Sequence, residues 1–237
     1  MKIGIMQPYF FPYLGYWQLM NVVDKYVIYD DVNYIKGGWI NRNRILSNGK
    51  PIYFNLGLIG ASPNKLINDI NINMDNRMIN KNLKTIIGCY SKAPYFNDVF
   101  PLIKKIMEHR DINLANYLKF SIEIIAHYLN IDTKIICSST IEKDNHKKGQ
   151  DKVIDICKKL NADSYYNSFG GKELYSFDDF KQNNIQLIFL KANLPEYKQY
   201  KNEFIPGLSI IDILMFNDQK TCINMLNDYQ VVINNEI

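Results

Sequence analysis

The pattern of hydrophobic and polar positions over the first thirty residues predicts a β-α-β unit. An apolar run at residues 3–7 is typical of a buried strand, and residues 14–24 carry apolar side chains at helical spacing. A second apolar run follows at residues 25–29. The segment between the two strands has room for a crossover helix and is too long for a tight hairpin, so parallel pairing is expected.

The pattern changes twice further along the chain. Asn48-Gly49 lies between two apolar runs and is the strongest short signal for a β-hairpin, whereas residues 58–64 have the composition of a loop. From residue 77 onward, apolar positions at helical spacing predict three helices. The predicted helices cover residues 77–91, 97–109, 113–129, 151–160, 177–182, 208–216 and 219–227, and the remaining predicted strands cover 67–72, 133–137, 164–166 and 185–190.

Alternation of strands and helices predicts an α/β fold with a Rossmann-like, mostly parallel sheet. We expect a single domain over residues 1–237, with a helical insertion at about 77–130. Hydrophobic residues make up 47% of the chain and charged residues 22%, so a substantial core is available.

Composition also limits which binding partners and which cellular compartment are expected. A net charge of +4 falls short of the basic runs of nucleic-acid-binding proteins, so no nucleic-acid partner is expected. The four cysteines are widely spaced without a C-x-x-C pair, which predicts reduced thiols and no structural metal. No segment has the length and hydrophobicity of a signal peptide or a membrane span. These features predict a cytoplasmic protein, for which a homodimer is one candidate assembly.

Paired carboxylates follow the second strand. The side chains of Asp30 and Asp31 point to opposite sides if the strand continues, so one of them could orient or deprotonate an amine. Two acids at a strand end are also compatible with Mg²⁺, which needs few carboxylates when a ligand supplies phosphates. The alternative is a cap of the turn near Asn33.

Cationic and glycine-rich segments form the other candidate binding elements. Lys36, Arg42 and Arg44 surround the flexible Gly37-Gly38 pair, and arginine forks suit the diphosphate of a nucleotide sugar. An ordinary basic surface loop is the alternative. Gly170-Gly171 follows a predicted strand, where backbone N–H groups could face an anion, or the pair could form a sharp turn.

Other motifs limit the chemistry. The three histidines lie beside no serine or cysteine nucleophile motif, and neither a Gly-x-Ser-x-Gly sequence nor a phosphate-binding Gly-x-x-x-x-Gly-Lys loop occurs, so hydrolase and P-loop chemistry are not expected. Ser209 is a favourable helix N-cap, and Asp212 three residues later completes an arrangement similar to a capping box.

Long motifs along the chain resemble the WbqC-like family. They are QPYFFPYLGYWQL at Gln7–Leu19, YDDV at Tyr29–Val32, GWINRNR at Gly38–Arg44, KAPYF at Lys92–Phe96 and LSIID at Leu208–Asp212. The resemblance covers nearly the whole chain. It implies an association with bacterial surface-polysaccharide (O-antigen) gene clusters and an activity of the glycine-transferase type, and it carries over no catalytic residues.

The amino-terminal unit is also similar to the start of the nucleotidylyltransferase and pantothenate synthetase superfamily. In that superfamily a His-x-Gly-His element grips nucleotide phosphates, whereas Tyr13-Leu14-Gly15-Tyr16 stands at the corresponding place here. Both histidines are replaced by tyrosine, which weakens the case for ATP. Gly15 could let the helix N-terminus approach a phosphate, or it could allow tight packing of the helix on the sheet.

Together these features predict an N-acyl or aminoacyl transferase that forms an amide on a nucleotide-linked amino sugar. The expected catalytic residues are Asp30, Asp31 and Tyr13. The expected substrate-binding residues are Gln7, Tyr9, Phe10, Gly15, Tyr16, Lys36, Arg42, Asn43, Arg44, Gly170 and Gly171. ATP, an acyl donor such as a CoA thioester and Mg²⁺ are candidate cofactors. The alternatives are a non-catalytic sugar-nucleotide-binding protein and an ATP-using enzyme similar to nucleotidyltransferases.

Overall fold

The predicted β-α-β unit opens the fold in the computed structural model, which describes residues 1–201 and 203–233. Strand β1 (Lys2–Met6) leads through helix α1 (Leu14–Val22) into β2 (Lys25–Ile28), and the two strands pair in parallel. The other strands are β3 (Arg42–Ser47), β4 (Lys50–Asn55), β5 (Leu58–Ile59), β6 (Asn71–Ile72), β7 (Lys134–Cys137), β8 (Ser164–Ser168), β9 (Gln186–Ala192) and β10 (Tyr229–Val232). The other α-helices are α2 (Asn76–Tyr90), α3 (Phe96–Met107), α4 (Leu114–Tyr128), α5 (Gly149–Lys159), α6 (Phe177–Gln182), α7 (Ile210–Phe216) and α8 (Gln219–Met225), and 3₁₀ turns cover η1 (Ile67–Asp69), η2 (Ser138–Thr140) and η3 (Phe169–Leu174).

Six strands form one sheet in the order β10-β9-β8-β1-β2-β7. All neighbouring pairs are parallel except β10 with β9, which is antiparallel. From β1 the chain proceeds outward through β2 and β7, then crosses to the other side of β1 and proceeds outward through β8 and β9. The sheet is therefore doubly wound, which confirms the predicted Rossmann-like α/β class, and the strand order reverses between β1 and β8.

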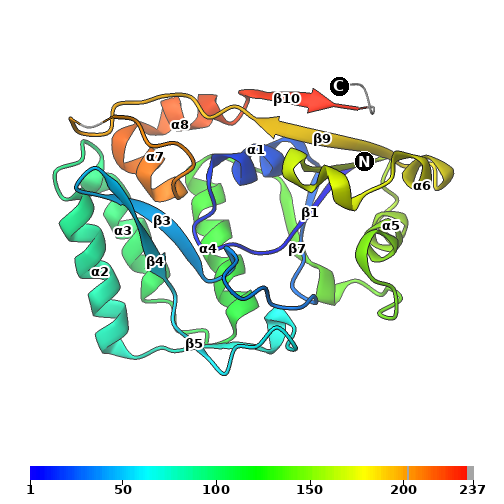
Figure 1. Ribbon diagram of the computed structural model, residues 1–237, viewed down its shortest axis with the longest axis horizontal. Helices are drawn as coiled ribbons and strands as arrows, with labels where there is room; N and C mark the ends of the chain where they lie inside the picture. The colour runs from blue at the N-terminus through cyan, green and yellow to red at the C-terminus, as the bar shows by residue number, and fades with distance from the viewer. Residues whose placement is uncertain (202, 234–237) are drawn as a thin grey trace.

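Both faces of the sheet are buried, because successive side chains of a strand point to opposite sides. Ile3, Val27 and Tyr165 pack with α5 and α6 in one hydrophobic cluster. Tyr26 and Tyr166, each one position away in the same strands, pack in the larger cluster with α1, α4 and the remaining helices. Figure 1 shows α2, α3 and the β3–β4 hairpin gathered on one side of the molecule, with α5 and α6 at the opposite side.

The β3–β4 hairpin forms where the Asn-Gly signal predicted it. Asn48 and Gly49 both adopt positive φ, 49° and 73°, which is the backbone conformation of a type I′ turn and suits the right-handed twist of the flanking strands. The two strands pair in antiparallel register from Arg42–Asn55 to Ser47–Lys50. The hairpin thus places Arg42 and Arg44 on one face and Asn43 on the other.

Three sequence predictions need correction. The predicted strand at residues 67–72 is a 3₁₀ turn, η1, followed by the two-residue strand β6. Its partner β5 lies in the segment predicted as a loop, because two paired residues leave too short a hydrophobic pattern to detect. Strand β10 was not predicted at all. The longest described helices, α2 and α4, have 15 residues each, and none of the described helices could span a membrane.

Candidate functional site

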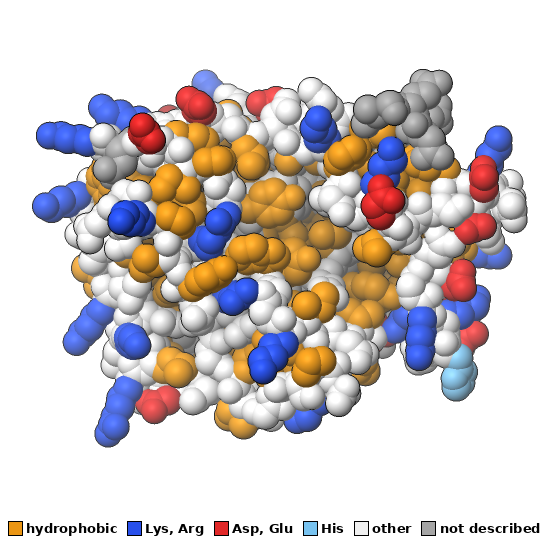
Figure 2. All heavy atoms as spheres, viewed as in Figure 1, with side chains coloured by type: hydrophobic (Ala, Val, Ile, Leu, Met, Phe, Trp, Pro, Cys, Tyr) orange, Lys and Arg blue, Asp and Glu red, His pale blue; other side chains and the backbone are white. Residues whose placement is uncertain are grey.

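The reversal of strand order brings two loops together at the carboxyl edge of the sheet. Gln7 and Tyr9 follow β1, and Gly170 and Gly171 follow β8, the strand paired with β1. A crevice outside the strand ends at such a reversal is the usual ligand site of an open α/β sheet. Over the region where Figure 1 places β1 and β7, the surface in Figure 2 is hollowed and lined by hydrophobic side chains.

Buried hydrogen bonds fix the loop after β1. The Phe10 amide donates to the Trp39 carbonyl at 3.1 Å, and the Asn43 side chain donates to the carbonyls of Phe10 and Phe11 at 3.1 and 2.7 Å. Phe11 has a φ of 45°, unusual for a bulky residue, and Ser209 Oγ also donates to its carbonyl. Phe10 and Asn43 are buried, so these two predicted binding residues hold the loop in place and do not face a ligand.

The tyrosines of this segment divide into buried and accessible ones. Tyr16 is buried and donates its hydroxyl to the Gln7 carbonyl at 3.2 Å, which makes it a support for the loop and corrects its predicted role in binding. Tyr9, which packs against Tyr16, and Tyr13 are half-buried. Burial raises the pKa of Tyr9, with a further contribution from Tyr13, so its hydroxyl stays protonated and can donate a hydrogen bond at neutral pH.

Gly15 lies in the first turn of α1 and serves packing. A Cβ atom placed on it would lie 2.7 Å from the Tyr13 ring and 2.8 Å from Ala192 Cβ on strand β9. Both distances are shorter than a normal carbon–carbon contact. The absence of a side chain therefore allows α1 to approach the sheet, which favours the packing alternative over direct contact with a phosphate.

Gly15→Ala should lower the free energy of unfolding by about 1–3 kcal/mol, because the added methyl group overpacks the interface between α1 and β9. Gly88→Ala is the matched control, since a Cβ at Gly88 in α2 meets nothing within 4 Å. It should stabilise the protein by about 0.5–1 kcal/mol through helix propensity. Urea denaturation measures both. Equal effects of the two substitutions would contradict the packing role of Gly15.

Asp30 is held by two serines that follow β7, the neighbour of β2. Its carboxylate is buried and accepts hydrogen bonds from Ser138 Oγ at 3.0 Å, from the Ser139 amide at 2.9 Å and from Ser139 Oγ at 2.5 Å. These contacts join the ends of the two strands. They do not form the cap near Asn33 that was the alternative from the sequence.

Asp31 is bound by two lysines that the sequence analysis missed. Its carboxylate lies 2.7 Å from Lys143 Nζ and 3.1 Å from Lys152 Nζ, and it also accepts a hydrogen bond from Ser138. The side chains of Lys143 and Lys152 are only 1% and 8% exposed. Lys152 also donates to the Asp31 carbonyl at 2.9 Å. With Asp30, these residues form a cluster of two negative and two positive charges.

The lysines determine what Asp31 can do chemically. Burial raises the pKa of Asp31, but hydrogen bonds from Lys143 and Ser138 and the charge of Lys152 outweigh burial, so the pKa lies below its usual value. A carboxylate with a lowered pKa is a weak base. Two ammonium groups in contact with it would also repel a magnesium ion, so the donor set at Asp31 does not fit Mg²⁺. Among the described residues there is no group of three or more potential metal ligands.

The two arginines lie on the outer face of the hairpin with different partners. Arg42 donates to the Gly38 carbonyl at 3.1 Å and to the Gly37 carbonyl, and its guanidinium lies 4.5 Å from the centre of the Tyr53 ring. These contacts occupy much of its hydrogen-bonding capacity. Lys36, in the preceding turn, is exposed.

Arg44 contacts Trp39 and the segment that precedes α7. It donates to the Gly207 carbonyl at 3.3 Å, its guanidinium is 5.7 Å from the Trp39 ring, and its Nε atom is buried without a described partner. The hydrogen bond between Phe10 and the Trp39 carbonyl joins this face to the loop after β1. Trp39 is 38% exposed, unusual for so large a ring. It was not among the binding residues predicted from the sequence.

Gly170 and Gly171 lie in η3, and neither is crowded by its neighbours. A Cβ on either would meet no atom closer than 3.5 Å, and neither glycine has a positive φ. Neither glycine supplies the left-handed residue of an αR–αL nest, so an anion would have to be bound by the turn conformation of η3. The pair nevertheless leaves the backbone after β8 free for close approach by a ligand.

A second buried polar cluster surrounds Asp212 in α7. Its carboxylate is fully buried and accepts hydrogen bonds from Tyr90 at 2.8 Å, Tyr197 at 2.7 Å and Gln199 at 2.6 Å. Ser209 caps α7 as predicted, but Asp212 does not reach back to complete a capping box. The cluster ties α2 and the segment after β9 to α7, and it supports the hairpin because Tyr90 also accepts a hydrogen bond from the Leu46 amide.

Comparison with known proteins identifies relatives across the whole fold. The model of the WbqC-like protein family matches residues 7–223. A protein of Mycobacterium tuberculosis (strain ATCC 25618 / H37Rv) described as "Uncharacterized protein Rv1507c" is 26% identical over 217 residues, which cover 90% of this chain and 92% of that protein. No solved structure matches the chain. The family match covers the residues of the crevice, the cluster around Asp30 and Asp31, and the cluster around Asp212.

Proposed function

Because the chain belongs to the WbqC-like protein family, we propose that it is an N-acyl or aminoacyl transferase of the glycyl type. Its acceptor would be the amino group of a nucleotide-linked amino sugar, and its pathway bacterial O-antigen biosynthesis. The observation that carries the proposal is the crevice at the reversal point, where Gln7 and Tyr9 after β1 lie at the same sheet edge as Gly170 and Gly171 after β8. Asp30 and Asp31 follow the adjacent strand β2.

In the proposed complex the nucleotide diphosphate occupies this crevice. Backbone groups near Gly170 and Gly171 would approach the phosphates closely, since no side chains stand between. Arg44 would reach the diphosphate from the hairpin side, with Trp39 offering an exposed aromatic face to a ring of the ligand. Half-buried sites lined by aromatic rings with a few polar groups are typical of small-ligand pockets.

The proposed chemistry joins the sugar amine to the acyl carbon of an activated donor. A C–N bond forms, and the bond from the acyl carbon to the donor's thiolate or phosphate breaks. Two protons leave the nitrogen: a base takes one from the ammonium before attack, and the departing thiolate or phosphate takes up the second after attack. We assign proton uptake to Asp30, which contacts serines and, among the described residues, no ammonium group. Ser139 Oγ, 2.5 Å from the Asp30 carboxylate, would relay the proton. The hydroxyls of Tyr9 and Tyr13 are candidate donors to the developing oxyanion.

In this scheme Asp31 stays negatively charged and holds two lysine side chains in position. Its two lysine contacts keep it ionised, so it would fix Lys143 and Lys152 below the crevice without taking up the proton. Lys152 Nζ also lies 5.5 Å from the Tyr29 ring, which places the cluster beside the last residue before the carboxylates. The scheme therefore gives the adjacent aspartates different roles.

Product formation tests the proposal. The protein is mixed with nucleoside-diphosphate amino sugars and either CoA thioesters or ATP with an amino acid, and mass spectrometry follows the gain of an acyl group on the sugar nucleotide. Asp30→Asn should abolish turnover while binding of the sugar nucleotide persists. Turnover that survives in Asp30→Asn would remove Asp30 from the reaction.

Saturation of both carboxylates favours one alternative, a sugar-nucleotide-binding protein without catalysis. Hydrogen bonds and ion pairs within the chain already occupy the carboxylate oxygens of both Asp30 and Asp31. Binding in the absence of turnover with every donor mixture would support this alternative. Release of pyrophosphate from a nucleoside triphosphate would instead indicate an enzyme similar to nucleotidyltransferases.

Arg44→Ala should weaken binding of the sugar nucleotide about 10-fold to 100-fold, because a hydrogen bond between charged groups contributes about 1.5–3 kcal/mol. Arg42→Ala should have a smaller effect, since carbonyl oxygens already occupy its Nε and one Nη atom. Thermal-shift titration measures both affinities, because a ligand of the folded state raises its apparent stability. An unchanged titration in Arg44→Ala would exclude this residue from the binding site.

A further inference from the structure

Helix α2 carries an uncompensated positive charge. It contains Arg77, Lys81 and Lys84 and neither Asp nor Glu, so the helix itself has a net charge of +3. All three side chains are exposed, and none takes part in an ion pair among the described residues. Their spacing of four and three residues places them on one side of the helix. The acid nearest in sequence, Asp75, is engaged as the N-cap and accepts a hydrogen bond from the Arg77 amide.

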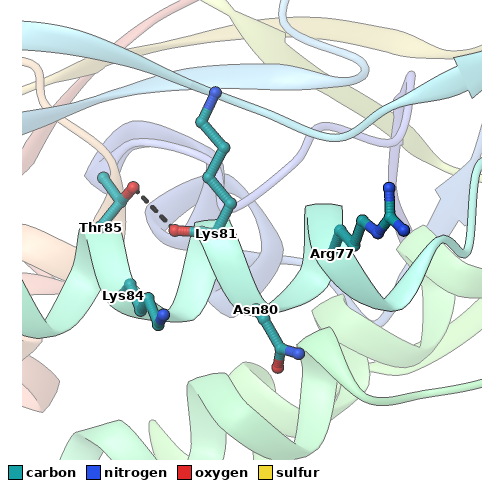
Figure 3. A pocket seen from close by; sticks show the side chains of 5 residues that line it. All are labelled: Arg77, Asn80, Lys81, Lys84 and Thr85. Carbon is teal, nitrogen blue, oxygen red and sulfur yellow. Dashed lines mark hydrogen bonds between the residues drawn. The ribbon is translucent and has the colours of Figure 1, made fainter.

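A surface cavity lies between these side chains. Its volume is about 560 Å³, and its lining is Arg77, Asn80, Lys81, Lys84 and Thr85. Figure 3 shows that all five come from one helix, with Lys81 and Asn80 extending to opposite edges of its exposed face. The Thr85 hydroxyl is used within the helix, where it donates to the Lys81 carbonyl at 2.9 Å. The cavity is therefore open to solvent and dominated by cationic groups.

Lysine and arginine side chains also dominate the flank of the molecule where α2 lies. Figure 2 shows many of them protruding there, with few acidic side chains among them. The crevice at the reversal point is on a different part of the molecule, over β1 and β7. The charge on α2 thus has no role in the proposed reaction.

One exposed apolar side chain on the same helix points to the kind of surface that α2 meets. Ile87 is 41% exposed and follows Lys84 by three positions, so it borders the basic residues. An anionic bilayer offers both phosphates for the cations and an acyl boundary for apolar side chains, as basic interfacial helices require. A nucleic-acid backbone offers phosphates but no acyl boundary for apolar side chains.

We propose that the exposed face of α2, defined by Arg77, Asn80, Lys81, Lys84 and Ile87, docks the protein on an anionic membrane surface through lipid phosphates. The contact is peripheral and sensitive to salt, because three basic residues give modest attraction that falls off within a Debye length. It holds the crevice near a membrane without any segment spanning the bilayer. This role is separate from the proposed transferase activity.

Co-sedimentation with vesicles tests the docking. The full-length protein should bind vesicles that contain phosphatidylserine or phosphatidylglycerol at low ionic strength, and phosphatidylcholine vesicles much less. The triple substitution Arg77→Gln, Lys81→Gln, Lys84→Gln should weaken binding to anionic vesicles about 100-fold, since each basic residue near such a surface strengthens binding about fivefold. Ile87→Ser should weaken it further.

A second triple substitution, Lys158→Gln, Lys159→Gln, Lys181→Gln, is the control. It removes the same charge from exposed positions on α5 and α6, at the opposite side of the molecule. Normal vesicle binding by this control supports the proposal. Equal loss in both triple variants would overturn it, because net charge alone would then explain binding. Tighter binding to a DNA duplex than to vesicles, or a thermal shift with inorganic phosphate but no vesicle binding, would overturn it as well.

Discussion

Asp31→Asn should lower the free energy of unfolding by about 3–5 kcal/mol, because it leaves two buried lysines without a counter-charge. Lys143 and Lys152 both bind the Asp31 carboxylate, and their side chains are 1% and 8% exposed. An unpaired ammonium group in such a place costs far more than the same group in water. Asparagine keeps the shape of the residue, so lost charge and not lost volume would cause the change.

Urea denaturation measures this loss, and Glu123→Gln is the control. Glu123 pairs with Lys119 at 2.6 Å, but both side chains are partly exposed, so its removal should cost about 0.5 kcal/mol or less. A loss below about 1 kcal/mol in Asp31→Asn would mean that water reaches the lysines and that the cluster is not a buried ionic site.

The pH dependence of stability provides an independent test of the same cluster. The folded-state pKa of Asp31 is lowered, so its contribution to stability is fully present above the unfolded-state pKa of about 3.9 and is lost as the pH falls through the folded-state value. The wild-type protein should therefore lose stability over this acidic range. Asp31→Asn should show a shallower decline there.

Asp212→Ala should lower the free energy of unfolding by about 3 kcal/mol, because three donors, two of them fully buried, would lose this acceptor together. Tyr90, Tyr197 and Gln199 all donate to this carboxylate, and a buried unsatisfied polar group costs about 1–3 kcal/mol. Asp212→Asn keeps one acceptor oxygen and should cost less. Chemical denaturation of the two variants separates lost hydrogen bonds from lost charge.

The control for Asp212 is Asp218→Ala. Asp218 is exposed and caps α8 by accepting a hydrogen bond from the Thr221 amide, so its loss should cost clearly less than the loss of Asp212. Burial raises the pKa of Asp212 in spite of its three hydrogen bonds. Its ionisation therefore opposes folding as the pH rises above about 4, opposite in sign to Asp31. Equal costs for Asp212→Ala and Asp218→Ala would contradict the assigned network.

Local sequence patterns were sufficient for most of the fold. The apolar runs on either side of α1 predicted parallel pairing of β1 and β2, and Asn48-Gly49 predicted the hairpin, since both signals depend on neighbouring residues. Strand β10 was missed because its pairing with β9 is a tertiary contact. Four residues at the end of a chain carry too little periodicity to reveal it.

Sequence reasoning located the carboxylates of the candidate site but not the groups that bind them. Lys143 and Lys152 are two of 28 lysine and arginine residues, and their neighbours in sequence distinguish neither from a solvated lysine. Their partner Asp31 follows β2, more than a hundred residues earlier. Only the folded sheet, which places β7 beside β2, brings these charges together. Asp212 and Tyr90 are likewise far apart in sequence, so their hydrogen bond could not be predicted from local patterns.

Hydrogen–deuterium exchange with a bound sugar nucleotide tests the central claim, which is that ligand occupies the crevice between the ends of β1 and β8. The nucleoside-diphosphate amino sugar with the largest thermal shift would be used at saturation. Exchange should slow in residues 7–16 and 168–175, on the two sides of the reversal point. Slower exchange confined to α2 or to the edge formed by β9 and β10, with those two segments unchanged, would contradict the account.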